Sequence, residues 1–325
     1  MTTKNGNAAP VKRVENKRPG LFFDLLRRLV LEKPLGTFGL GLIIIFFTMG
    51  IFSKFIMPFS WSQIHLLERL QGPSGRYFLG TDELGRDEMS RLIYGARISM
   101  EIGIGATFLN TVVSILIGAS SGFLGGKTDM IVQRFVDVWM SIPGFVILLT
   151  VMTILPRSLL MMILVLGITG GIGGARLVRS AVIAIKSNTY ISASDAIGCS
   201  PVRILLVHII PNIMPTLIIM FTLGIGGNIL AEAGLSFLGF GLPPGVPSWG
   251  VLINSSQAYL QTDPQLALWP GLALSLAVFG MNMFGDSIRD LLDPRLRGGV
   301  GRYALSDKKL NELKENLAGK AAAVK

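Results

Sequence analysis

Residues 190–212 read YISASDAIGCSPVRILLVHIIPN and form a polar, cationic segment between two long apolar blocks. At the start of this segment, apolar and small side chains recur at helical spacing, at Tyr190, Ala193, Ala196 and Ile197. This spacing predicts a short helix.

A turn and a second helix are predicted to follow. Gly198 is placed to end the first helix in the left-handed conformation. Ser200 offers a side-chain cap, and Pro201 suits the first position of a new helix. Pro211 is expected to mark the boundary with the next apolar block. Two short helices held between membrane spans can transmit movement of a soluble partner to the membrane-spanning helices.

The composition of the whole chain indicates a membrane protein. Apolar residues make up 50% of its 325 residues, charged residues 15%, and the mean hydropathy is +0.57. Soluble domains carry about 25% charged residues. The long apolar blocks predict an all-α polytopic membrane protein with six transmembrane helices. We place these at 35–55, 98–123, 138–155 with a kink at Pro143, 159–178, 211–239 and 266–285.

The segments outside the spans are polar. Residues 1–34 are basic; we expect disorder over 1–20 and an amphipathic surface helix over 21–31, ended by Pro34. No cleavable signal peptide is expected. The charges of 58–97 cancel, and we expect a solvated network with Thr81 or Asp82 capping a helix. A surface helix is expected at 305–317.

The distribution of Lys and Arg predicts the orientation. With the N-terminus inside, the inner segments hold 23 of these residues and the outer segments seven. The positive-inside rule then places both termini and the 186–211 loop in the cytoplasm. The net charge of +10 is therefore explained by the basic residues of the cytoplasmic segments, and we expect no nucleic-acid partner.

The 190–212 segment resembles the cytoplasmic EAA loop of permease subunits of ATP-binding-cassette (ABC) importers. The matching positions are Ala193, Gly198, Ile209 and Pro211. Ser192 stands where the family has Glu. If Thr189 is the N-cap, Ser192 lies at N3, where Glu would close a capping box. Serine cannot supply that charge, so we expect this helix to begin less firmly.

The resemblance extends to the dipeptide/oligopeptide/nickel transport family, specifically to its second permease subunit. It covers about residues 75–297 and the first span, including LGTDELGRDEMSRLIYGARIS at 79–99, AEAGLSFLG at 231–239 and GDSIRDLLDPR at 285–295. The predicted spans and their orientation divide the chain into a cytoplasmic tail at 1–34, a first transmembrane helix at 35–57, an extracytoplasmic segment at 58–97 and a cytoplasmic tail at 287–325. Residues 98–286 would form a type I permease core with five transmembrane helices and the coupling loop 186–211.

The resemblance also implies a function and partners. The chain would be a pore-forming subunit of an ATP-driven peptide importer in the bacterial plasma (inner) membrane. Its partners would be a second permease subunit in a heterodimer, two ATP-binding subunits, an extracytoplasmic substrate-binding protein and membrane lipid. Nickel complexes and oligosaccharides are alternative cargoes within this class. We expect coupling to the ATPase through Ser192, Ala193, Asp195, Gly198, Arg203 and Pro211.

Three polar residues within the apolar blocks are further candidates. Glu232 lies near one end of its span, where it would either be hydrogen-bonded at a subunit interface or to an outer loop, or line the substrate path. Asn110 and Asn282 are expected to be interhelical hydrogen-bond partners rather than ligands.

The sequence predicts no catalytic site, cofactor or metal site. GFLGGKT at 122–128 lacks phosphate-loop spacing and follows an apolar helix, so ATP hydrolysis would belong to separate subunits. Cys199 is the single cysteine, and His65 and His208 fall in different compartments of the predicted topology. A secondary transporter is the alternative of another class, but no inverted internal repeat is evident.

Overall fold

The computed structural model describes residues 21–292, and the predictions for 1–20 and 305–317 lie outside this range. The described residues contain helices and no strand beyond an isolated bridge between Thr81 and Asp87. Within residues 21–292, five helices are long and apolar enough to cross a membrane when α9, η2 and α10 are taken as one. Their main segments are α2 (Pro34–Ile51), α4 (Glu88–Leu124), α7 (Leu159–Lys186), α10 (Ile210–Phe237) and α12 (Gln265–Leu292).

The shorter elements connect these helices. They are α1 (Leu21–Glu32), α3 (Ser53–Ile56), η1 (Leu66–Glu68), α5 (Gly126–Ser141), α6 (Gly144–Ile154), α8 (Thr189–Ala196), α9 (Pro201–Arg203), η2 (Ile204–Ile209), α11 (Trp249–Ser256) and η3 (Gln257–Tyr259). The predicted helix over 21–31 is confirmed as α1. Its Leu29 is buried against the rest of the protein, whereas Leu31 is exposed.

The third crossing is not the single kinked helix predicted over 138–155. Instead α5 and α6 meet at 84° around Pro143. Pro143 has no N–H to donate, so the helix breaks there. With 11 residues, α6 is about 16 Å long and cannot cross the hydrocarbon core alone. A sixth crossing is therefore present only if α5 and α6 together form one broken span.

The predicted boundary at Pro211 coincides with the start of α10 at Ile210, but the helix does not break there. From Pro201 to Phe237 the chain is one helical path of 37 residues. Its second part, η2, is a π-helix, in which the N–H of Ile210 donates to the carbonyl of Leu205, five residues back. Pro211 has no backbone N–H to donate. The π turn just before it shifts the hydrogen-bond pattern of the helix, and the helix therefore continues through this proline.

Small residues allow α4 and α7 to lie close together. A Cβ atom added at Gly118 of α4 would lie 2.3 Å from the carbonyl oxygen of Ala175 in α7. One added at Gly171 of α7 would lie 2.5 Å from the Cβ of Val113. Side chains at these positions would force the two helices apart, as is typical of small residues at membrane helix contacts.

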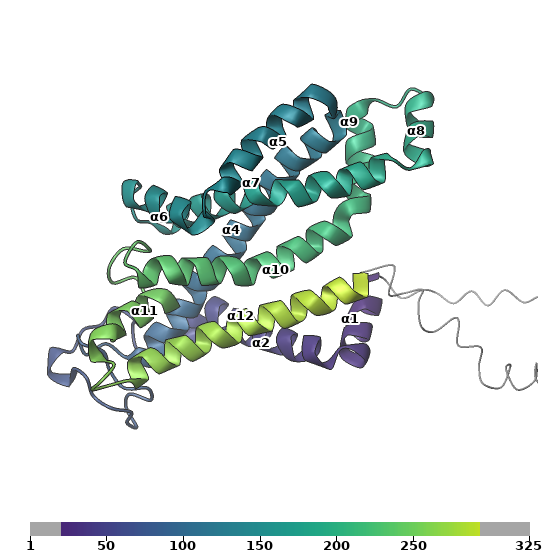
Figure 1. Cartoon of the computed structure of the whole chain (residues 1–325). Coiled ribbons are helices and arrows are strands. Elements are labelled where there is room, and N and C mark those ends of the chain that lie inside the picture. The colour runs from purple at the N-terminus through teal and green to yellow at the C-terminus, as the bar shows by residue number, and fades with distance from the viewer. Residues whose placement is uncertain (1–20, 293–325) are drawn as a thin grey trace, which may run out of the picture.

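The long helices run between two ends of the molecule. Figure 1 shows α8 and α9 at the same end as α1 and the last turn of α12. We call this the α8 end. The opposite end carries α11, the start of α4 and the segment before it (Figure 1). We call it the α11 end.

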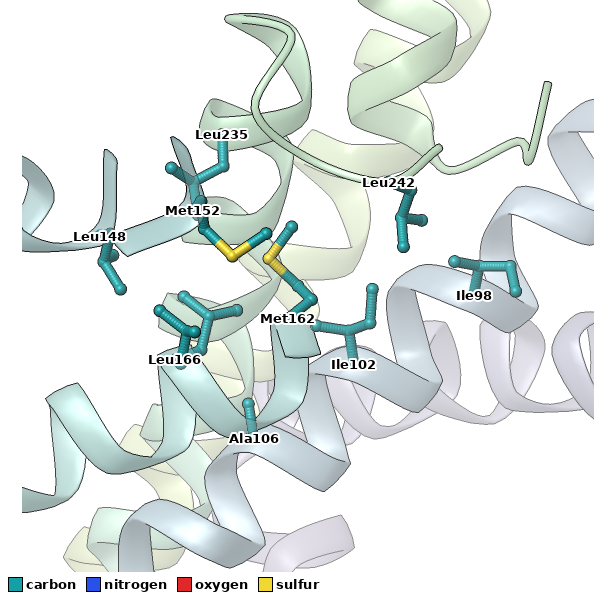
Figure 2. Packing of buried hydrophobic residues seen from close by; sticks show 10 residues of the cluster. Ile98, Ile102, Ala106, Leu148, Met152, Met162, Leu166, Leu235 and Leu242 are labelled. Atoms are coloured by element: carbon teal, nitrogen blue, oxygen red, sulfur yellow. The ribbon is translucent and has the colours of Figure 1, made fainter. Parts of the chain in front are cut away.

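One apolar cluster joins four helices toward the α11 end. Figure 2 shows Met152 of α6 and Met162 of α7 side by side. Around them pack Ile98, Ile102 and Ala106 of α4, Leu148 of α6, Val165 and Leu166 of α7, Leu235 of α10 and the loop residue Leu242. This cluster holds the short helix α6 in place against α4, α7 and α10.

Candidate coupling site

The turn between α8 and α9 has the predicted geometry. Gly198 has φ +84°, in the left-handed region, and its N–H donates to the carbonyl of Asp195 at 2.9 Å. The Ser200 hydroxyl accepts from the N–H of Arg203, and Pro201 takes the first position of α9. These contacts confirm the predicted helix end and the following cap.

The predicted N-cap of α8 is wrong by one residue. α8 begins at Thr189 with Asn188 as its N-cap, so Ser192 is at N4 rather than N3. A capping box therefore cannot involve Ser192. The Asn188 side chain does not accept from the helix start; it donates back to the carbonyls of Ala184 and Ile185. α8 thus begins with neither a side-chain cap nor an acidic residue in its first turn.

The α8–α9 segment (residues 189–203) is attached mainly through Ile191. This residue is 5% exposed and packs in a cluster with Val178 and Val182 of α7 and with Ile204 and Ile209 of η2. By contrast, Ile197 is 82% exposed and Val202 is 65% exposed. These two large apolar side chains are therefore left uncovered by this chain at the turn and in α9.

The structure brings most of the proposed coupling residues together. Five of the six proposed coupling residues are exposed within the α8–α9 segment: Ser192, Ala193, Asp195, Gly198 and Arg203. Pro211 is exposed but lies apart from them, in the first turn of α10.

Glu232 lies at the other end of α10, fully buried in this chain. Its Oε1 accepts from the hydroxyls of Ser236 and Ser248, each at 2.7 Å, and its Oε2 accepts from Ser99 at 3.3 Å. Within residues 21–292 no cation pairs with it. The carboxylate is thus hydrogen-bonded to Ser248 at the end of the loop between α10 and α11, and it is enclosed within this chain.

The Glu232 network also fixes α11, a role that the sequence did not reveal. Ser248 caps α11 by accepting from the N–H of Val251. Trp249 has 0% exposure, and its Nε1 donates to the Leu92 carbonyl of α4 at 3.3 Å. Its ring meets Phe46 of α2 edge to face. The sequence Pro-Ser-Trp-Gly at 247–250 carries a capping signal at Ser248, but burial of the Trp depends on tertiary packing.

The two asparagines do not make the expected bonds between helices. Asn110 accepts from Ser114 of its own helix and lies against Gly170 of α7. Asn282 of α12 lies near Gly226 of α10. A buried bond between helices is made instead by Asn228 of α10, whose Nδ2 donates to Thr107 of α4 at 2.8 Å.

Charge pairs fasten α5 to α7 toward the α8 end. Arg179 of α7 donates to both carboxylate oxygens of Asp129, at 2.6 and 2.5 Å. Asp129 also accepts from Ser121 of α4, and Arg176 donates to Asp137. α5 is thus tied to the two helices that flank it, close to the α8–α9 segment.

The segment before α4 is folded rather than a solvated charge network. Asp82 is 2% exposed and accepts from Arg86 at 2.7 Å and from the buried Arg91. α4 is capped by Asp87, not by Thr81 or Asp82, and includes residues 88–97 of the predicted polar segment. The Tyr77 hydroxyl donates to Glu68, and this bond lowers the pKa of the Glu68 carboxyl.

Neither histidine has partners for a metal. His65 lies in the segment before α4 at the α11 end, and His208 in η2 toward the α8 end (Figure 1). No group of three or more His, Cys, Asp or Glu side chains in the described part of the chain could hold a metal ion.

Comparisons with known proteins agree with this architecture. The family model described as "Binding-protein-dependent transport system inner membrane component" matches residues 114–298. The chain is 35% identical over 291 residues to the oligopeptide transport system permease protein OppC of Bacillus subtilis (strain 168), covering 90% of this chain and 95% of that protein. It is 35% identical to the glutathione transport system permease protein GsiD of Escherichia coli O157:H7, covering 79% and 85%.

The fold is shared with a solved transporter. A structure described as an inward-facing conformation of the MetNI methionine ABC transporter aligns with a TM-score of 0.52 at 19% identity, covering 63% of this chain and 97% of that one. The matches confirm the resemblance to ABC importer permeases and the prediction of a transport subunit rather than an enzyme. The chain therefore belongs to the family of inner-membrane components of binding-protein-dependent transport systems.

Proposed function

We propose that this chain is one of two pore-forming permease subunits of an ATP-driven peptide importer, and that the α8–α9 segment couples it to the ATPase subunits. The observation that carries the proposal is the continuous helical path from Pro201 to Phe237. It joins an exposed apolar turn at the α8 end to the buried Glu232 network at the α11 end. A force applied to the turn therefore reaches the far end of the molecule.

Movement of the α8–α9 segment would follow from its attachments. Ile191 ties α8 to α7, and η2 joins α9 to α10. When ATP draws two ATPase subunits together, the segments of two permeases would move with them. The flanking helices α7 and α10 would then rock and open the pore toward the binding protein. The partners in this proposal are a second permease, two ATP-binding subunits and an extracytoplasmic substrate-binding protein.

The proposed orientation places the α8 end in the cytoplasm of a bacterial cell. The excess of Lys and Arg on the segments assigned to the inside supports this. In the structure, α1 and the end of α12 lie at the same end as α8 (Figure 1). With this orientation, residues 58–97 and α11 face outward, and 98–286 form the permease core.

Peptide cargo is supported by the relatives. OppC is named as an oligopeptide transport permease, and GsiD is named as a permease for glutathione, a small peptide. Pulling down the tagged chain from its own cells and reconstituting the complex tests the proposal. We expect two ATP-binding subunits and a second permease, and ATP-dependent uptake of a peptide bound by the cognate binding protein. Uptake by the chain alone, driven by an ion gradient, would show a secondary transporter. A binding protein that takes nickel complexes or oligosaccharides would refute the cargo.

A further inference from the structure

A groove of mixed chemistry lies between α2 and α4 near the α11 end. It encloses a cavity of about 320 Å³ lined by Phe47 and Ile51 of α2, by Met100 and Ile104 of α4, and by Arg97 and Glu101. Gly50 of α2 approaches the Arg97 backbone here, since a Cβ on it would lie 3.2 Å from the Arg97 Cα. The groove is therefore narrow, apolar along its length and charged on one side.

The charged side lies at the edge of the apolar part of α4. Arg97 directly precedes the apolar run that begins at Ile98, and its Nε donates to Glu101 at 2.8 Å. The two side chains keep 34% and 43% of their surface exposed. Charged groups facing hydrocarbon are costly, so they need polar partners at the membrane boundary.

A second cavity beside the groove adds a cation and an aromatic pair. It measures about 540 Å³ and includes Lys54, Trp61 and Tyr94 in its lining. The Trp61 and Tyr94 rings stack at 4.9 Å, and the Arg97 guanidinium lies over Tyr94 at 5.9 Å. Lys54 is exposed just past the end of α2, and within residues 21–292 no acid pairs with it. Trp, Tyr and Lys are the residues that meet lipid headgroups.

We propose that this groove binds an anionic phospholipid. Its phosphodiester would lie between Lys54 and Arg97, below the Trp61–Tyr94 pair. One acyl chain would follow the apolar wall formed by Phe47, Ile51, Met100 and Ile104. Lys54, Arg97 and Glu101 together carry one net positive charge, which a singly charged headgroup such as phosphatidylglycerol balances and a zwitterionic one does not. The groove lies in the outer leaflet if the chain has the orientation proposed above, so this location rests on the proposed function.

Photo-cross-linking tests this site in the purified importer complex. The probes are phosphatidylglycerol and phosphatidylcholine carrying the same photoreactive acyl chain, and labelled peptides are mapped after digestion. We expect phosphatidylglycerol to label residues 47–57 and 94–104 at least fivefold more than phosphatidylcholine does. Equal labelling by both lipids, or labelling spread evenly over all spans, would overturn the proposal.

Two variants test the contacts to the lipid headgroup and to the acyl chain separately. Lys54→Gln removes the unpaired cation but keeps the Arg97–Glu101 pair. Ile104→Trp fills the apolar wall and changes no charge. Each should lower labelling at the groove at least threefold, whereas Arg157→Gln, in the α6–α7 connection at the same end of the molecule, should not. Unchanged labelling in both groove variants, or a disulfide between cysteines placed in the groove and the second permease, would refute the site. Labelling requires neither ATP nor cargo, so its failure would leave the transport proposal standing.

Discussion

At the scale of single residues, Gly198 matters because of its backbone angle. Its φ is +84°, and no atom beyond its two chain neighbours lies within 4 Å of where a Cβ would be. A substitution there is therefore opposed by backbone strain of about 1–2 kcal/mol rather than by a clash. Because α8 is attached mainly through Ile191, strain of this size is enough to shift the turn.

Gly198→Val should uncouple ATP hydrolysis from uptake while leaving membrane insertion intact. We expect uptake to fall several-fold, and ATPase activity of the complex to continue without its usual dependence on the binding protein. Gly173→Val is the control, because Gly173 lies within α7 and also has free space at its Cβ position. Normal coupled transport by Gly198→Val would remove the turn from the mechanism.

Ser248 offers a second residue-scale test. Its hydroxyl donates to the buried Glu232 and also caps α11. Ser248→Ala leaves the carboxylate with one donor fewer, which should cost about 1–3 kcal/mol. Thermal unfolding of the detergent-solubilised protein should show a clearly lower Tm. Ser255→Ala, in the same helix but bonded only to the Leu252 carbonyl, should change the Tm little. Equal Tm values for both variants would argue against the network.

At the scale of elements, the ion pairs made by α5 differ in geometry, and only some of them join α5 to α7. Arg179 and Asp129 form a two-point bond with side chains 27% and 17% exposed. Arg134 and Asp137 are 3.9 Å apart within α5, and the arginine side chain is 81% exposed. Partly buried two-point pairs are worth more than exposed ones.

Double-mutant cycles should separate these two pairs. We expect Arg179→Gln and Asp129→Asn to show a coupling energy of about 1 kcal/mol or more in unfolding. Arg134→Gln and Asp137→Asn should show nearly none. A coupling energy near zero for the first pair would mean that the Arg179–Asp129 pair does not hold α5 against α7.

Helix periodicity and capping residues predicted most of the elements, because these signals are local. The Gly198 turn, the Ser200 cap and five of the spans follow from residue types read over a few positions. The α8 start was misplaced because Asn188 and Thr189 are both good cap residues and the choice depends on how α7 ends. The π turn before Pro211 and the 84° break at Pro143 depend on where neighbouring helices can pack.

The Glu232 network was harder to predict for the same reason. An acid in an apolar block signals a special environment, and both an outer loop and a substrate path were consistent with it. The three serines that bond it are spread over positions 99, 236 and 248. Ser236 lies four residues after Glu232 on the same helix, but no spacing rule links Ser99 or Ser248 to this carboxylate.

At the scale of the whole molecule, the two ends differ in how firmly their elements are held. The α11 end is tied by buried polar contacts that join α4, α10 and α11 around Glu232 and Trp249. The α8 end presents an exposed apolar turn with one large buried anchor. Such a division suits a protein that takes up motion at one end and transmits it through stiff helices to the other.

The location of the α8–α9 segment can be measured with a membrane-impermeant maleimide. Ile197→Cys, in a chain where Cys199 is replaced by alanine, puts a thiol at the most exposed point of the turn. We expect no labelling in intact cells, labelling once the membrane is permeabilised, and protection when the ATP-binding subunits are bound. Leu67→Cys, fully exposed at the α11 end, should label in intact cells. Labelling of the position-197 thiol in intact cells would contradict a cytoplasmic coupling site.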